Sequence, residues 1–474
     1  MMSTSSPVTP ASKPFLWGAA SAAYQVEGGI YTDQRGRSVW DYYLDDLSLA
    51  GPGISGAIAI NFYEREQYLQ DIALLQQWGI NSYRFSMAWS RILPDGLGVV
   101  NPAAIKHYRQ FILDLKAAGI EPMLTLYHWD MPLALARAGG WSNRESIDWF
   151  TRYAEVVFAN FADLVELFVL VNEPLVEHAF TMVANERIAG QASQLAILPA
   201  EHQLVSALNA FNHILLASAA AKRSFQAKGY QGRLGVALPL MPTLTLEGAS
   251  EQDKVAARLA DGVLNRWFLD ALYKGSYPAD VLAVVAQSGL ELSIQPDDAA
   301  TIQAAQWDYL GVNYYAPMFI RHRATAQGAY TPEVFLPEGT YAAFNGPVRP
   351  DQFLALLTRL QTEYGNPVVM ITENGAGFPN EDQLVNGAVH DTQRSRYLVG
   401  HIQAMQQARA QGANVQGYHV WSSHDNLEWL SGYDSRFGMI YVDFDTQQRI
   451  PKQSASIYAR LIKGETVTEA DCNL

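Results

Sequence analysis

Two glutamates stand at the ends of two short apolar runs that lie far apart in the chain. LFVLVNE (167–173) ends in Glu173, and PVVMITE (367–373) ends in Glu373. A short, continuous apolar run is typical of a strand buried on both faces, so each run predicts a strand that ends at an acid. A facing pair of carboxyl groups can cleave a glycosidic bond: one protonates the leaving oxygen, and the other attacks the anomeric carbon or activates water.

A single glutamate at a strand end is ordinarily a solvated side chain. Here, polar and aromatic residues follow most of the apolar runs. Exposure to solvent does not easily explain why so many such residues stand at strand ends. They are Gln25, Arg84, His128, Trp129, Asn172, Asn313, Tyr315, Trp421, Glu428 and Trp429. Arg84 by its charge, or Tyr315 by a hydrogen bond, could keep one glutamate ionised while the other holds its proton.

His128 could be a hydrogen-bond donor or a structural histidine. No second ligand stands at helical spacing from it. The sequence therefore predicts no metal site, and it predicts no cofactor.

The elements that position these residues are eight apolar runs separated by helical patterns. Amphipathic segments such as 68–79 and 104–119 end in Gly, a common helix stop. Alternating strands and helices imply parallel pairing, and eight strands fit a closed barrel. We predict a single (β/α)8 TIM barrel over 14–464, with the active site at the C-terminal ends of the strands, between a disordered tail (1–13) and a C-terminal tail (465–474). The runs are 15–20, 80–86, 121–127, 167–173, 233–240, 307–315, 367–373 and 415–421.

Composition narrows the class of protein. Hydrophobic residues make up 49% of the chain and charged residues 17%, which is typical of a folded protein with a large core. The net charge of −14 argues against a nucleic-acid partner, because phosphate binding needs clustered Lys and Arg. The single cysteine, Cys472, forms no internal disulfide. No secretory signal or uninterrupted membrane-spanning run is evident, so we expect a cytoplasmic protein without a membrane partner.

Together the motifs resemble glycoside hydrolase family 1, the β-glucosidase family. The resemblance runs from FLWGAASAAYQVEGG (15–29) to QQRIPKQSASIYARLI (447–462), nearly the whole chain. The matching segments between them are GRSVWDYY (36–43), YRFSMAWSRILPDG (83–96), YHWDMPLAL (127–135), GGWSN (139–143), VNEP (171–174), NRWFLDALYKGSYP (265–278), LGVNYY (310–315), ITENG (371–375) and GYHVWSSHDNLEWLSGYDSRFGMIYVDF (417–444).

The resemblance implies a retaining β-glycosidase in which Glu373 is the nucleophile and Glu173 the acid/base. Their carboxyl groups should then lie about 5–5.5 Å apart. It also implies that Arg84 and Tyr315 position and ionise Glu373, and that Asn172 bonds the 2-hydroxyl of the sugar. Asn313 belongs to the same catalytic set. Trp421 would be the floor under the sugar ring, and the remaining hydroxyls would be held by Gln25, His128, Trp129, Glu428 and Trp429.

Glu428 favours unphosphorylated sugars, because a carboxylate would repel a 6-phosphate. We therefore expect a β-glucoside or a short β-linked oligosaccharide as substrate. A broad β-galactosidase/β-fucosidase or a transglycosylase on the same site is the alternative. A non-catalytic sugar-binding barrel is a remote one, since binding alone does not need both Glu173 and Glu373. Oligomeric state stays open, a homo-oligomer included.

Three departures from the family pattern lie outside the sugar-binding set. The stretch 175–199 lacks the usual Gly-rich pattern, and GPVRP (346–350) lacks a tryptophan that usually flanks the leaving group. His424 stands where an apolar residue is usual, and we expect it to be a wall residue without chemistry. The leaving group thus stays open between glucose, a longer oligosaccharide, and an aryl or plant alcohol.

Overall fold

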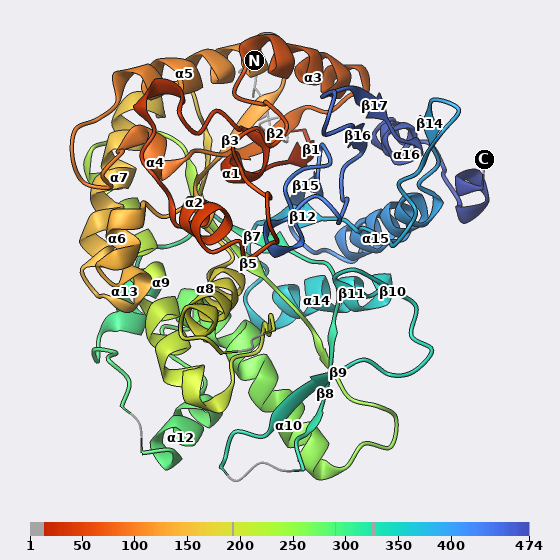
Figure 1. Ribbon diagram of the computed structural model, residues 1–474. Helices are drawn as coiled ribbons and strands as arrows, with labels where there is room; N and C mark the ends of the chain where they lie inside the picture. Colours follow the sequence, from red (N-terminus) through yellow and green to blue (C-terminus); the bar gives the residue numbers. More distant parts are fainter. Residues whose placement is uncertain (1–13, 192–193, 290, 325–327, 474) are drawn as a thin grey trace, which may run out of the picture.

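The computed structural model describes residues 14–191, 194–289, 291–324 and 328–473, so the predicted N-terminal tail lies outside the described residues. Eight parallel strands close into a barrel, and β15 pairs with β1 to complete it (Figure 1). These strands match the eight predicted runs, so the TIM barrel is confirmed. In order around the barrel they are β1 (Leu16–Ala20), β2 (Ser82–Ser86), β3 (Glu121–Tyr127), β4 (Leu167–Asn172), β5 (Arg233–Pro239), β7 (Tyr309–Asn313), β12 (Val369–Asn374) and β15 (Val415–Trp421).

Helices between the strands surround the barrel (Figure 1). The two predicted amphipathic segments are among them, as α3 and α5. Local sequence explains the start of α5: Asn101 Oδ1 accepts a hydrogen bond from Ala103 N–H at 3.1 Å, and Pro102 fills the first helical position. The longer helices are α3 (Arg65–Gln77), α5 (Pro102–Ala117), α7 (Ser146–Phe161), α8 (Pro174–Ile188), α9 (Leu204–Ala227), α10 (Glu251–Asp261), α14 (Pro350–Glu363), α15 (Thr392–Ala410) and α16 (Gln453–Ile462).

The long connections after the strands carry short elements that the sequence did not predict. After β5 and β7 they form a three-stranded sheet of β6 (Thr243–Leu244), β8 (Met318–His322) and β9 (Pro332–Phe335). Three hairpins pair β10 (Ala342–Ala343) with β11 (Gly346–Pro347), β13 (Leu384–Val385) with β14 (Ala388–Val389), and β16 (Ile440–Val442) with β17 (Arg449–Pro451). The shorter helices are α1 (Ala23–Val26), α2 (Val39–Asp41), α4 (Trp89–Ile92), α6 (Leu133–Arg137), α11 (Trp267–Tyr273), α12 (Ala279–Gln287) and α13 (Asp298–Gln303).

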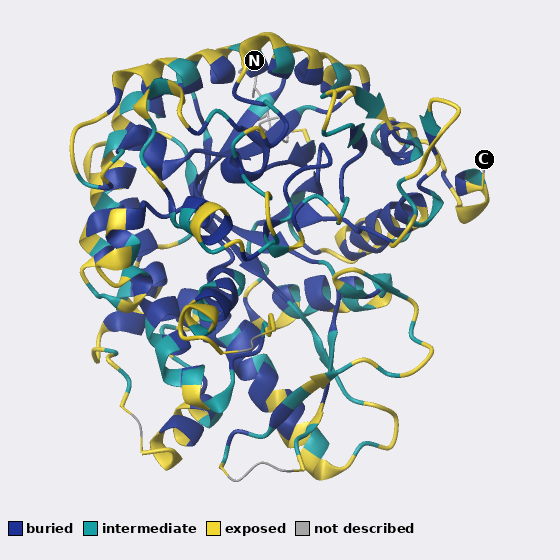
Figure 2. Cartoon of the chain, in the orientation of Figure 1, coloured by how far each residue is buried: buried dark blue, intermediate teal, exposed yellow. Residues whose placement is uncertain are grey.

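Burial follows this architecture, with the barrel strands and the inner faces of the helices buried (Figure 2). Buried side chains of the barrel strands form a cluster that includes Met123, Val169, Tyr309 and Met370. One helical stretch, 201–227, is long and apolar enough on average to cross a membrane, although polar residues interrupt it. However, 78% of its most apolar window is buried inside the protein, as expected of a core helix.

The segment after α16 packs on the barrel. It ends in a 3-10 helix (Glu469–Cys472), and both Val467 and the Cys472 thiol are buried. Gln403 on α15 donates to the Val467 carbonyl at 3.1 Å. The single cysteine is therefore a packing residue.

Candidate active site

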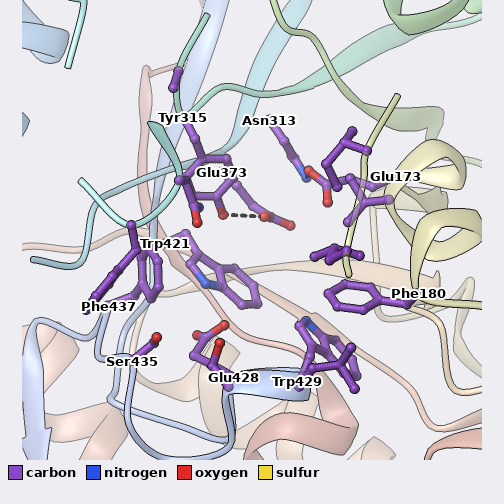
Figure 3. A pocket seen from close by; sticks show the side chains of 18 of the residues that line it. Glu173, Phe180, Asn313, Tyr315, Glu373, Trp421, Glu428, Trp429, Ser435 and Phe437 are labelled. Atoms are coloured by element: carbon purple, nitrogen blue, oxygen red, sulfur yellow. Dashed lines mark hydrogen bonds between the residues drawn. The ribbon is translucent and has the colours of Figure 1, made fainter. Parts of the chain in front are cut away.

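A cavity of about 390 Å³ opens at the C-terminal ends of the barrel strands (Figure 3). Glu173 and Glu373 point into it from opposite sides. Gln25, Arg84 and Asn172 are buried and are not among the described residues that line the cavity. The predicted site residues that line the cavity are His128, Trp129, Glu173, Asn313, Tyr315, Glu373, Trp421, Glu428 and Trp429.

Glu373 receives a hydrogen bond on each carboxyl oxygen. Arg84 Nη1 donates to Oε1 at 2.5 Å, and the Tyr315 hydroxyl donates to Oε2 at 2.7 Å. Burial raises the pKa of Glu373, while the charge of Arg84 and the hydrogen bond from Tyr315 act to lower it. Arg84 and Tyr315 therefore stabilise the ionised form of Glu373 against the effect of burial.

Glu173 has a different environment. Asn313 Nδ2 donates to Glu173 Oε1 at 2.9 Å, and no cation contacts this carboxyl group among the described residues. Burial, followed by the charge of Glu373, raises the pKa of Glu173 well above its usual value. Of the two acids, Glu173 has the environment that more strongly favours a bound proton.

Rigid elements hold both acids in place. Arg84 is on β2, where its Nε donates to Thr125 Oγ1 at 3.0 Å and its Nη2 to Asn172 Oδ1 at 2.6 Å. Asn313, at the end of β7, also donates to Asn172 Oδ1, at 3.0 Å. Asn172 thus links the guanidinium that contacts Glu373 to the amide that contacts Glu173.

Asn172 sets the orientation and tautomer of His128. Asn172 Oδ1 accepts from Arg84, so the amide nitrogen of Asn172 faces His128 Nε2, at 3.1 Å. His128 Nε2 is then an acceptor and the proton lies on Nδ1, which has no partner among the described residues. Burial lowers the pKa of His128 well below its usual value, so the ring is neutral. The neutral ring stacks near Trp421, with ring centroids 5.7 Å apart.

Glu428 lies on the wall beside Trp421 (Figure 3). Burial raises the pKa of Glu428 to about 8, against hydrogen bonds from Trp421 and Gln25. At neutral pH the carboxyl group is therefore mostly protonated. In that form it can both donate and accept hydrogen bonds, which suits a pair of sugar hydroxyls.

The outer wall of the cavity consists of residues that the sequence analysis did not identify. They are apolar, and several lie in or beside 175–199 and 346–350, the two segments that depart from the family pattern. In the sequence, only that departure pointed to these residues. The main ones are Val176, Phe180, Leu195, Ile197, Met241, Met318, Phe344 and Phe437.

His424 does not line the cavity, so the prediction of a wall residue is wrong. Its side chain is fully buried. Its Nε2 lies 3.1 Å from Asp71 Oδ1 on α3, and its Nδ1 lies 2.8 Å from Ser423 Oγ. One of these two polar neighbours, Asp71, comes from a helix distant in sequence.

Three residues at the cavity adopt a left-handed backbone that non-glycine residues rarely adopt. They are Trp129 (φ 73°), Glu173 (φ 44°) and Trp429 (φ 44°). For Glu173 this bend joins β4 to α8 and turns the carboxyl group into the cavity. Nothing in the sequence signals it, because none of the three is glycine or asparagine.

Metal-binding chemistry has no candidate in the described part of the chain. No group of three or more His, Cys, Asp or Glu side chains there could hold a metal ion. The chemistry considered below uses the side chains alone.

Comparison with known proteins identifies the family. The family model for Glycosyl hydrolase family 1 matches residues 9–467. The chain is 62% identical over 459 residues to beta-glucosidase A of Enterobacter agglomerans, covering 97% of this chain and 96% of that protein. It is also similar to a 6-phospho-beta-galactosidase of Clostridium acetobutylicum, with 32% identity over 94% of this chain and 96% of that protein.

Solved structures lead to the same family. The beta-glucosidase of Thermotoga maritima in complex with castanospermine superposes with a TM-score of 0.86 at 34% identity, covering 96% of this chain and 99% of that one. The predicted glycoside hydrolase class is confirmed. With its barrel, its paired acids and a family match over nearly its whole length, the chain belongs to glycosyl hydrolase family 1.

Proposed function

We propose that this protein is a retaining β-glucosidase that removes terminal, unphosphorylated β-D-glucosyl residues, with Glu373 as nucleophile and Glu173 as acid/base. The observation that carries the assignment of roles is the asymmetry of the two acids. Glu373 is bonded on both oxygens, by a guanidinium and a phenol, whereas Glu173 is bonded by a neutral amide. A nucleophile must be ionised and a general acid must carry a proton, and these environments favour that division.

The reaction then proceeds in two displacements. Glu373 attacks the anomeric carbon while Glu173 gives its proton to the departing oxygen, which releases the alcohol and leaves a glucosyl ester on Glu373. Water enters next, and Glu173, now ionised, takes its proton as the water attacks the same carbon. Glucose leaves with its β configuration, and both acids return to their starting forms.

Unphosphorylated sugars fit the charge of the cavity better than 6-phosphorylated ones. Among the described residues that line it, none is Lys or Arg, so a phosphate dianion would find no cation there. We therefore place the chain with the β-glucosidases it resembles and not with the 6-phospho-beta-galactosidase.

The stereochemistry of the first product tests this function. We expect the intact protein to hydrolyse an aryl β-glucoside and to release β-glucose before mutarotation, because two inversions restore the configuration. Proton NMR of the anomeric region in the first minutes measures this directly. Initial release of α-glucose would instead indicate a single displacement by water, and a protein inactive on gluco, galacto and fuco substrates would support the sugar-binding barrel.

The apolar outer wall predicts a preference among leaving groups. A second glucose would bring hydroxyls against Phe180, Leu195 and Phe344, whereas an alkyl or aryl alcohol would bury carbon there. Each added methylene is worth about 0.8 kcal/mol when fully buried, or about fourfold. We expect kcat/KM for n-alkyl β-glucosides to rise about two- to fourfold per methylene from butyl to octyl, and to exceed that for cellobiose.

Steady-state kinetics on the alkyl series measures this slope. Phe344→Ser should flatten it, while Leu336→Ser, an exposed apolar residue outside the cavity, should leave it unchanged. A flat series in the intact protein, with cellobiose the better substrate, would show that the wall does not select apolar alcohols.

A further inference from the structure

Tyr315, which donates a hydrogen bond to Glu373, stands beyond the end of its own strand. The pairing of β7 with both of its neighbours ends at Asn313. The Tyr315 ring is only partly buried and packs edge-on against Phe437, with ring centroids 6.4 Å apart. A hydrogen bond weakens steeply when its donor is misaligned, so the position of Tyr315 has to be fixed by contacts outside the barrel sheet.

Two side chains bond the peptide groups on either side of the Tyr315 α-carbon. Asn374 Nδ2 donates to the Tyr314 carbonyl at 2.6 Å, and the Tyr397 hydroxyl donates to the Tyr315 carbonyl at 2.9 Å. Each peptide group is planar, so fixing both planes leaves the main chain of Tyr315 little freedom to rotate. These two bonds take over where the strand pairing ends at Asn313.

The polarity of these bonds is set by groups that can only accept. The Tyr314 carbonyl cannot donate, so Asn374 must face it with its nitrogen, while Asn374 Oδ1 accepts from the Tyr418 hydroxyl at 2.6 Å. The second proton of Asn374 Nδ2 goes to the Tyr397 oxygen at 3.0 Å. The single proton of Tyr397 is therefore left for the Tyr315 carbonyl.

Tyr397 is itself held firmly on α15. Its side chain is buried, and its ring stacks on His401 one helical turn later, with ring centroids 3.7 Å apart. His401 Nδ1 lies 2.8 Å from the Tyr397 carbonyl, and burial lowers the pKa of His401 to about 4, so the stacked ring is neutral. Tyr397 is not among the described residues that line the cavity, so it can affect a substrate only through other residues.

We propose that Tyr397 is a positioning residue that holds Tyr315 where its hydroxyl reaches the nucleophile. The connection runs from the Tyr397 hydroxyl to the main chain of Tyr315, and from the Tyr315 hydroxyl to Glu373 Oε2 at 2.7 Å. This inference rests on the proposed function, because it takes Glu373 to be the nucleophile. A side chain on α15 thus supports the reaction without contacting the sugar.

Tyr397→Phe keeps the stacked ring and removes only the hydroxyl. We expect kcat/KM for an aryl β-glucoside to fall about 10-fold, because small displacements of catalytic groups are costly. The hydrogen bond from Tyr315 lowers the pKa of Glu373, so a weaker bond raises it. The acidic limb of the pH profile should therefore move to higher pH. The change leaves in place the other ionisable side chains whose charge acts on Glu373 or is acted on by it, which are Arg84, Glu173 and Glu428.

The same substitution without the Tyr315 hydroxyl separates positioning from general support. Tyr315→Phe alone should lower kcat/KM by about 10- to 100-fold, because it removes a hydrogen bond to a buried carboxylate. Adding Tyr397→Phe to that variant should lower kcat/KM by less than about twofold more, because the group that Tyr397 positions is already gone. A structural role would produce the same loss in both backgrounds.

Control variants account for effects on folding. Tyr153→Phe removes another fully buried tyrosine hydroxyl, which donates to the Leu126 carbonyl at 2.8 Å and lies outside the cavity lining. It should lower the thermal midpoint without moving the acidic limb. Tyr418→Phe removes the hydroxyl that orients Asn374 and serves as the test if Tyr397→Phe does not fold. Its loss of kcat/KM should likewise disappear in the Tyr315→Phe background.

The measurement is kcat/KM against pH for the intact protein, each single variant and the double variant, with a thermal melt beside each. A loss and a shifted acidic limb in Tyr397→Phe, with neither added in the Tyr315→Phe background, support the inference. An unchanged kcat/KM, an unmoved acidic limb or an equal loss in both backgrounds overturns it. An intact protein that hydrolyses no glycoside overturns the proposed function instead, so the two failures are distinct.

Discussion

Glu373→Gly is expected to lose activity on aryl β-glucosides by a factor on the order of 10⁵ or more, and to regain it when azide is added. Removing the carboxylate removes the nucleophile and leaves a space beside Arg84 and Tyr315. Azide can enter that space and attack the anomeric carbon from the same face, while Glu173 still protonates the leaving oxygen. The product should be α-glucosyl azide, identified by the anomeric proton in NMR.

The matched control is the same substitution at the other acid. In Glu173→Gly the nucleophile remains, so the glucosyl ester still forms from a good leaving group and azide attacks it from the opposite face. The product should be β-glucosyl azide. An α-azide from Glu173→Gly, or a Glu373→Gly protein that is active without azide, would show that the two roles are exchanged or misassigned.

Glu173→Ala is expected to produce the second-largest effect, and the effect should depend on the leaving group. General acid catalysis contributes about 10²- to 10⁴-fold. We expect a loss of that size on an alkyl β-glucoside, whose alcohol needs a proton to depart. A dinitrophenyl β-glucoside needs little protonation, so formation of its glucosyl ester should be nearly unaffected, and a burst of dinitrophenol should precede slow turnover.

The pH profile of the same variant tests the proton on Glu173. Burial and the charge of Glu373 raise the pKa of Glu173, so kcat/KM of the intact enzyme should fall as the pH rises through that raised pKa. The alkaline limb should disappear in Glu173→Ala, while the acidic limb, set by ionisation of Glu373, should remain. An unchanged alkaline limb would assign that titration to another group.

The barrel and its acids were predictable because both depend on local patterns. Each barrel strand is a short apolar run, and a buried parallel strand must be apolar on both faces. In a barrel the catalytic groups follow the strand ends, so reading those ends found Glu173 and Glu373. The apolar runs around Val169 and Met370 predicted the two strands at whose ends these acids stand.

The rest of the site depends on contacts that no local pattern records. Phe344 and Leu195 reach the cavity from long connections whose paths the sequence does not specify. His424 was misread because its partner, Asp71, lies on a helix near the other end of the chain. The direction of the Gln25 amide depends on carbonyl groups of the backbone, which are present at every residue and so give no sequence signal.

The left-handed backbone at Trp129, Glu173 and Trp429 has a consequence for how such an enzyme evolves. A non-glycine residue held in this conformation costs about 1–3 kcal/mol, which the surrounding packing has to offset. Glycine would adopt the same bend without that cost. Selection or engineering for heat resistance alone would therefore favour replacing the very residues that carry the chemistry. Keeping large side chains at these three bends therefore gives up some folding stability in return for the groups that line the cavity.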